Sequence, residues 1–343
     1  MSCRAVLICP GRGTYNKPEL GYLHRHHAGN PLLDTFDELR RAEGQTPVTE
    51  LDGAERFSNA THTVGDAASP LIYAASYLDR QSLAEDIEVV AVTGNSMGWY
   101  IALAAAGALD AQGGFTVVNT MGRLMQEASI GGQLVYPCTG PDWRPDPARR
   151  AGLLETVRQI DSGGDAVLRL SIDLGGMLVL AGNDAGLAEF EASVPRLDGR
   201  FPMRLPHHAA FHTHLQEPVA QQGRDALPSS LFSQPEIPLI DGRGAIWWPG
   251  ATDRDALHAY TLGHQVTQPY DFTRAVQIAA REFAPDMFIV TGPGNTLGGA
   301  VAQSLVAGGW HGMHSKAAFT ARQSETPLLV SMGLEDQRTI VTG

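Results

Sequence analysis

The 343-residue chain has little cysteine, no long apolar run and an excess of negative charge. Its three cysteines, Cys3, Cys9 and Cys138, are an odd set without the spacing of a metal site. We therefore expect reduced thiols rather than a disulfide framework. No apolar run approaches the length of a membrane span, so no membrane partner is expected. The formal net charge of −12 argues against nucleic acid as a partner.

The start of the chain also lacks a targeting signal. Residues 1–10 have no long apolar region like that of a signal peptide and lead straight into a predicted core strand, which favours the cytoplasm. The composition, 43% hydrophobic and 18% charged, is typical of a soluble α/β protein. The length suits one large domain with an insertion, or two domains.

The predicted organisation centres on residues 87–109, where an apolar run is followed by Gly94-Asn-Ser-Met-Gly98 and an alanine-rich segment. This order predicts a strand, a sharp turn and a helix, the arrangement of a nucleophile elbow that exposes Ser96 at a helix N-terminus. The backbone N–H of Met97 would then point toward an oxyanion. The motif alone is weakly specific in a chain with 38 glycines, and an ordinary tight turn is the alternative.

The rest of the first 130 residues reads as a helix-rich α/β unit. A buried strand is predicted at 4–9, and the loop Pro10-Gly-Arg-Gly13 after it could supply a second oxyanion donor. A dinucleotide-binding interpretation of this loop fails because Asn16 occupies the third glycine position. Helices are predicted at 30–41, 67–81 and 113–128, the second opening at Ser69-Pro70 with Ser69 as N-cap.

From Gly132 the pattern changes to the order βαββαβ, which indicates a ferredoxin-like small subdomain at 131–205. Its strands are expected at 133–136, 166–172, 177–181 and 201–205, and its helices at 148–160 and 185–194. The predicted fold class is thus α/β, with an α/β-hydrolase-like large subdomain of parallel sheet (1–130 and 206–343). In the remainder of the large subdomain, strands are predicted at 234–246 and 285–290 and helices at 253–264, 270–282 and 298–306. The tail after Gly308 shows no clear pattern of secondary structure.

A serine nucleophile needs a base, and histidine is the usual one. His212 follows the insertion in a setting of small and apolar residues, although a hydrogen-bonded core histidine remains the alternative. Spacing identifies no acidic residue to orient it. The histidines at 24, 26 and 27 are read as surface residues, because no carboxylate or cysteine accompanies them. No metal site is predicted.

Five motifs together resemble the malonyl-CoA:acyl carrier protein transacylases and, similarly, the acyltransferase domains of polyketide synthases. They are Pro10-Gly-Arg-Gly, Gly94-Asn-Ser-Met-Gly, Val118-Asn-Thr-Met-Gly-Arg-Leu-Met-Gln-Glu-Ala128, Ala210-Phe-His-Thr-His-Leu-Gln-Glu-Pro218 and Gly292-Pro-Gly-Asn-Thr-Leu297. The resemblance covers about residues 4 to 305 and has the ferredoxin-like insertion in the family's place.

The resemblance implies a Ser-His dyad of Ser96 and His212, with Gln265 orienting His212 through its carbonyl. The backbone N–H groups of Arg12 and Met97 would form the oxyanion hole. An acyl group would pass from acyl-CoA through acyl-Ser96 to the phosphopantetheine thiol of an acyl carrier protein, in fatty-acid or polyketide biosynthesis, by ping-pong kinetics. No permanently bound cofactor is implied, and contacts to CoA are assigned to Arg12 and Asn295.

The chain departs from the family where the family holds the malonyl carboxylate. An ungapped match puts Met121 in place of that arginine, which predicts an uncharged acyl group. The alternative is a relocated clamp at Arg12, where the family has glutamine, unless Arg12 points to solvent and only its N–H matters. Arg123 faces elsewhere on the helix. The predicted acyl pocket is completed by Asn95, Trp99 and Phe211.

Three other functions remain open. An editing hydrolase of the same fold would release acyl-Ser96 to water rather than to a carrier thiol. An α/β-hydrolase esterase would need a late histidine such as His311 or His314. A carrier-binding module without activity would leave Ser96 unmodified. Because carrier proteins are acidic, docking would require a local basic patch, for which Arg149 and Arg150 are the candidates.

Overall fold

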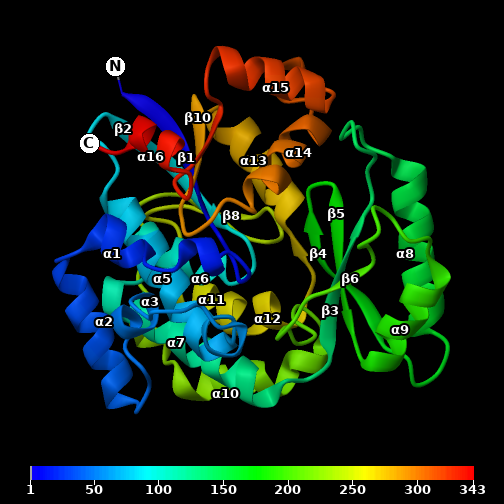
Figure 1. Ribbon diagram of the computed structural model, residues 1–343, viewed down its shortest axis with the longest axis horizontal. Coiled ribbons are helices and arrows are strands. Elements are labelled where there is room, and N and C mark those ends of the chain that lie inside the picture. The colour runs from blue at the N-terminus through cyan, green and yellow to red at the C-terminus, as the bar shows by residue number, and fades with distance from the viewer. Residues whose placement is uncertain (1) are drawn as a thin grey trace.

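The computed structural model describes residues 2–343 as an α/β fold of two subdomains, as predicted (Figure 1). The larger one is built on a six-stranded sheet with the order β11-β10-β1-β2-β7-β8. Its pairs are parallel except for the hairpin of β7 and β8. The strands are β1 (Cys3–Cys9), β2 (Ile87–Gly94), β7 (Leu239–Ile240), β8 (Ile246–Trp247), β10 (Met287–Val290) and β11 (Leu329–Ser331).

Strand β1 is the centre of this sheet, because β10 and β2 pair with it on either side. Its residues 5–9 are fully buried, as expected of a continuous apolar run covered by helices on both faces. The helices of this part are α1 (Tyr22–His27), α2 (Pro31–Ala42), α3 (Val48–Asp52), α4 (Asn59–His62), α5 (Gly65–Gln81), α6 (Gly98–Ala105), α7 (Ala111–Ala128), α10 (Glu217–Ala226), α11 (Arg254–Ala259), α12 (Gln265–Thr267), α13 (Phe272–Phe283), α14 (Gly298–Ala307), α15 (Lys316–Glu325) and α16 (Glu335–Val341).

The second sheet has the order β6-β3-β5-β4-β9 and lies beside the first (Figure 1). The elements of the insertion are β3 (Gly132–Pro137), α8 (Pro147–Asp161), β4 (Leu168–Leu174), β5 (Met177–Gly182), α9 (Asp184–Ser193) and β6 (Met203–Arg204). Its four strands pair antiparallel, in the spatial order of a ferredoxin-like unit. The fifth strand, β9 (Tyr270–Asp271), was expected to begin a helix; instead it pairs with β4, and α13 starts at Phe272, two residues later than predicted.

Helix α5 begins earlier than the sequence suggested. Ser69 is not its N-cap: the helix starts at Gly65, and Ser69 and Pro70 lie inside it. Proline lacks the N–H that would bond the carbonyl four residues earlier, which is that of Asp66. Arg40 Nη1 donates to this carbonyl at 2.6 Å, and the helix therefore continues through Pro70.

The tail after Gly308 is ordered secondary structure, contrary to the weak signal in its sequence. Strand β11 extends the large sheet, and helices α15 and α16 pack beside it. Arg338 of α16 reaches the buried carboxylate of Asp79, with Nη1 at 2.7 Å from Oδ1. The predicted strand at 234–246 is instead the short hairpin of β7 and β8, because a turn at 241–244 interrupts it.

The cysteines Cys3, Cys9 and Cys138 are free thiols. Within residues 2–343, no helix is both long enough and apolar enough to cross a bilayer. The same residues contain no cluster of three histidine, cysteine or acidic side chains that could bind a metal ion.

Candidate active site

The turn between β2 and α6 holds Ser96 in a strained conformation. Ser96 has φ of 56°, in the left-handed region that residues other than glycine rarely adopt. The motif's two glycines are required by close backbone contacts: a Cβ on Gly94 would lie 2.1 Å from the Gly98 carbonyl oxygen, and one on Gly98 would lie 2.1 Å from that of Cys9. The turn therefore has the tight geometry of a nucleophile elbow.

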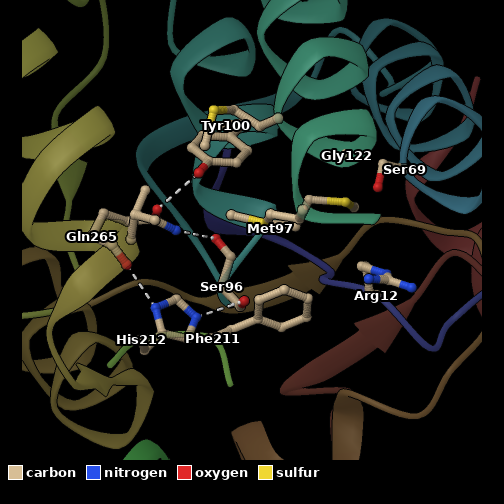
Figure 2. A pocket seen from close by; sticks show the side chains of 12 residues that line it. Arg12, Ser69, Ser96, Met97, Tyr100, Gly122, Phe211, His212 and Gln265 are labelled. Atoms are coloured by element: carbon tan, nitrogen blue, oxygen red, sulfur yellow. Dashed lines mark hydrogen bonds between the residues drawn. The ribbon is translucent and has the colours of Figure 1, made fainter. Parts of the chain in front are cut away.

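His212 lies directly beside this serine (Figure 2), with Ser96 Oγ 2.8 Å from His212 Nε2. On the other side of the ring, His212 Nδ1 lies 2.6 Å from the backbone carbonyl oxygen of Gln265. A carbonyl oxygen can only accept a hydrogen bond, so Nδ1 carries the hydrogen and Nε2 is free to accept the serine proton. Burial lowers the pKa of His212 to about 4, which keeps the ring neutral at physiological pH.

Gln265 forms hydrogen bonds with both catalytic candidates, Ser96 and His212. Its Nε2 donates to the backbone carbonyl of Ser96 at 3.0 Å, and its Oε1 accepts a hydrogen bond from Tyr100 at 3.0 Å. Gln265 therefore contacts the histidine through its main chain and the serine through its side chain. No carboxylate takes part in this chain of contacts within residues 2–343.

Two backbone donors beside Ser96 have no acceptor. The N–H of Met97, at the head of α6, and the N–H of Arg12, in the loop after β1, make no hydrogen bond to any other residue in 2–343. The loop of Arg12 is held against the elbow, because Asn95 donates its N–H to the Cys9 carbonyl at 3.0 Å. Both donors are thus available to an oxyanion.

A small pocket opens at Ser96 and His212. Its lining includes two of the residues suggested for the acyl pocket, Met121 and Phe211. Trp99 is not part of the lining, which corrects its assignment to the acyl pocket. It is fully buried behind the elbow, where its indole N–H donates to Thr261.

The cavity is also lined by residues that the sequence did not suggest for it, which are Ser69, Tyr100, Gly122, Met125 and Val266. Ser69 was interpreted as the N-cap of α5, whereas the helix begins at Gly65 and Ser69 lies inside it. Tyr100 lies in the first turn of α6, and its hydroxyl donates to Gln265. Its position, as a polar residue in the first turn after the elbow, was the one feature of the sequence that could have placed Tyr100 in the site.

Arg12 points into the cavity rather than into solvent. Its Nη2 donates to the carbonyl oxygens of Thr63 (3.0 Å) and His207 (2.9 Å), and its guanidinium lies 5.6 Å from the ring centre of Phe211. Asn95 and Asn295, by contrast, lie outside the lining; Asn295 is exposed in the loop after β10.

The remaining candidates do not converge on the cavity. His311 and His314 are exposed and do not line it, so a late-histidine arrangement is absent from the structure of residues 2–343. Arg123 pairs with Glu127 on the outside of α7. In the suggested docking patch, Arg150 is paired with Asp173 at 2.5 Å, and Arg149 donates to the carbonyl of Pro137.

The chain is similar to proteins of known sequence and structure. No protein-family model matches the chain. The malonyl CoA-acyl carrier protein transacylase of Escherichia coli is 25% identical over 86% of this chain and 90% of its own length. A polyketide synthase of Streptomyces halstedii is 28% identical over 60% of this chain, a match that spans only 3% of that much longer protein.

Among solved structures, the malonyl-CoA:ACP transacylase of Synechocystis has a TM-score of 0.74 at 18% identity, with 98% of this chain and 100% of that chain covered. This likeness establishes the fold, and the sequence matches extend along most of the chain. The chain is therefore similar to malonyl-CoA:acyl carrier protein transacylases along most of its sequence, and it shares their fold.

Proposed function

We propose that the protein is an S-acyltransferase that moves an acyl group from CoA to the phosphopantetheine thiol of an acyl carrier protein. The observation that carries this proposal is the 2.8 Å contact between Ser96 Oγ and a neutral His212 Nε2 at the head of α6. The relatives named as acyl carrier protein transacylases support the acceptor. Fatty-acid or polyketide assembly is the corresponding process.

In the first half-reaction, His212 Nε2 takes the hydroxyl proton as Ser96 Oγ attacks the thioester carbonyl of acyl-CoA. The carbonyl oxygen becomes an oxyanion, which the N–H groups of Arg12 and Met97 stabilise. The C–S bond then breaks, His212 returns the proton to the departing sulfur, and CoA leaves as a thiol. The acyl group remains as an ester on Ser96.

In the second half-reaction the roles reverse. The carrier's thiol gives its proton to His212, and its sulfur attacks the acyl-serine ester through the same oxyanion. The C–O bond breaks, Ser96 recovers its proton, and the acyl group leaves as a thioester of the carrier. Because CoA departs before the carrier enters, the kinetics are ping-pong.

Intact-protein mass spectrometry after brief mixing with malonyl-, acetyl-, propionyl- and longer acyl-CoAs tests the first half. We expect one acyl adduct on the wild-type chain and none on Ser96→Ala. Lack of an adduct with every acyl-CoA would refute the proposal. His212→Ala should slow adduct formation by about a hundredfold to ten-thousandfold, the usual contribution of a general base.

Addition of a phosphopantetheinylated carrier protein to the acyl-enzyme tests the second half. Transfer predicts a new acyl-carrier thioester in step with loss of the adduct. Loss of the adduct at the same rate with and without carrier, yielding free acid, would instead identify an editing hydrolase. The two products separate these functions because they differ only in whether a thiol or water resolves acyl-Ser96.

The acyl group that this pocket accepts depends on two residues of its lining. Met121 stands where, by resemblance, the family has its carboxylate-binding arginine, and its thioether carries no charge. Considered alone, Met121 favours an uncharged acyl group. Arg12 lines the same cavity with a charged guanidinium, and the charge preference of the pocket depends on which of them meets the end of the acyl group.

A further inference from the structure

The acyl cavity contains two polar side-chain atoms that are buried and have no partner. They are Oγ of Ser69, a residue that is 1% exposed, and Nε of Arg12. Both residues line the cavity that holds Ser96. Figure 2 shows them on one side of this cavity, across from Ser96 and His212. Buried polar groups are nearly always hydrogen-bonded, so a shared pair of unpartnered atoms marks a place where a ligand group is missing.

The guanidinium of Arg12 is fixed in place by neutral groups. The carbonyl oxygens of Thr63 and His207 hold Nη2, and the ring of Phe211 lies beside it. No carboxylate in residues 2–343 forms a salt bridge with it. Burial lowers the pKa of Arg12 to about 10, which still leaves the side chain cationic at neutral pH. The charge of nearby Asp66 favours the protonated form of Arg12. Within residues 2–343, however, no carboxylate is in ion-pair contact with this rigidly held guanidinium.

A carboxylate at the end of the acyl group would supply what both atoms lack. One oxygen would accept from Arg12 Nε and the other from the hydroxyl of Ser69, and the negative charge would offset the buried cation. A simple alkanoyl chain would exclude water from both groups and leave them unsatisfied, which is unfavourable. The polar atoms therefore select against an apolar acyl terminus.

The phosphates of CoA are not an alternative partner at this position. They are separated from the thioester carbon by the whole pantetheine arm, whereas Arg12 and Ser69 line the same cavity as Ser96. The remaining lining is largely apolar, with Met97, Met121 and Phe211 among its members. This combination suits a short chain with one polar end.

On the basis of the proposed function, we infer that Arg12 and Ser69 bind the free carboxylate of the acyl group. The substrate class is then a short dicarboxylic monothioester, of which malonyl-CoA is the simplest. The specificity contact lies on the loop after β1 and on α5, instead of on α7 where Met121 stands.

A pair of substrates of matched shape tests this inference: malonyl-CoA and isovaleryl-CoA, in which an isopropyl group replaces the planar carboxylate. The readout is kcat/KM for acylation of Ser96 with each. We expect the wild type to favour malonyl-CoA. Arg12→Gln keeps the backbone N–H and should lower the malonyl:isovaleryl ratio by about thirtyfold to several thousandfold, the effect of losing one partner of a buried charge pair.

Ser69→Ala provides a second variant that does not depend on the loop contacts of Arg12. Removing an unpartnered buried hydroxyl should leave the thermal unfolding midpoint unchanged or raise it. The ratio should fall by about tenfold to a hundredfold, as for a lost hydrogen bond to a charged group. Arg123→Gln is the matched control, since it removes an exposed positive charge from α7 and should leave the ratio unchanged.

Two outcomes would overturn the inference while acyl transfer stands. In one, isovaleryl-CoA acylates Ser96 as well as or better than malonyl-CoA. In the other, Ser69→Ala and a folded Arg12→Gln both keep the wild-type ratio. Failure of malonyl-CoA to acylate Ser96 while another acyl-CoA succeeds would also overturn the inference, whereas failure of every acyl-CoA would refute the proposed function itself.

Discussion

The environment of His212 makes a sharp prediction about the pH dependence of acylation. No carboxylate contacts its ring; Nδ1 faces the Gln265 carbonyl, and the side chain is 3% exposed. Burial penalises the imidazolium form, and no neighbouring negative charge compensates. The pKa of His212 is accordingly lowered to about 4, from an ordinary value of 6.5. We expect kcat/KM for acylation to stay high well below pH 6.

The size of the effect follows from the fraction of neutral base. At pH 5, a histidine with a pKa of about 4 is about nine-tenths neutral, whereas one with a pKa of 6.5 is about 3% neutral. The two cases differ by about thirtyfold in available base at that pH. Because kcat/KM reports the free enzyme, its acid limb gives the pKa of His212 before substrate binds.

The assay is stopped-flow or quench-flow acylation of Ser96 between pH 4 and 8, with an acyl-CoA at concentrations below KM. An acid limb centred at pH 6 or above would refute the argument from burial. Acid unfolding must be monitored separately by circular dichroism, because the pKa of the buried His208 is also lowered, to about 3. Below pH 6.5 the unfolded chain binds protons that these two folded histidines do not, so stability falls as the pH falls.

Three further outcomes are expected. Trp99→Phe should lower the free energy of unfolding by about 2 kcal/mol, measured by urea denaturation, and leave acyl-CoA selectivity unchanged, because Trp99 packs outside the cavity. Gln265→Ala keeps the backbone carbonyl but loses the bond to the Ser96 carbonyl, and should reduce the acylation rate by about tenfold in single-turnover kinetics. Gly98→Ala places a Cβ 2.1 Å from the Cys9 carbonyl oxygen and should abolish acylation and lower the melting temperature by several degrees, followed by calorimetry.

Local patterns predicted most of the elements, because their signals are contained in short windows. The apolar run before Gly94 and the alanine-rich segment after Gly98 were sufficient to predict the strand, the turn and the helix of the elbow. Asn30 and Asp110 likewise cap α2 and α7 with side chains that accept backbone hydrogen bonds, close to the predicted starts. The order of elements in 131–205 predicted the ferredoxin-like sheet for the same reason.

The failures concern residues whose partners are distant in the chain. The start of α5 was misplaced because Pro70 lies inside the helix, where the Asp66 carbonyl that it cannot bond accepts instead from Arg40, 30 positions before Pro70. Helix α16 has a weak pattern of its own, and the ion pair of Arg338 with Asp79 ties it to the core. In both places a buried cation satisfies a group that local sequence leaves open.

The substrate question shows the same limit within the site. Met121 was visible as a departure from the family, and it suggested an uncharged acyl group. The orientation of Arg12 was not visible, since a side chain in a Gly-rich loop can face solvent or the cavity. Its contacts with Thr63 and His207 turn it inward, and these contacts favour the alternative of a relocated clamp.

Strand β9 connects the small sheet to the catalytic groups. Tyr270 and Asp271 pair with Ile172 and Asp173 of β4, and Tyr270 also donates its hydroxyl to the Gly94 carbonyl at 2.5 Å and lies against the ring of His212. Two adjacent residues thus couple the small subdomain to the elbow and to the base. We expect a force on the small sheet, such as that of a docking carrier, to reach the catalytic groups through Tyr270 and through the hydrogen bond from Ser171 Oγ to the Phe211 carbonyl.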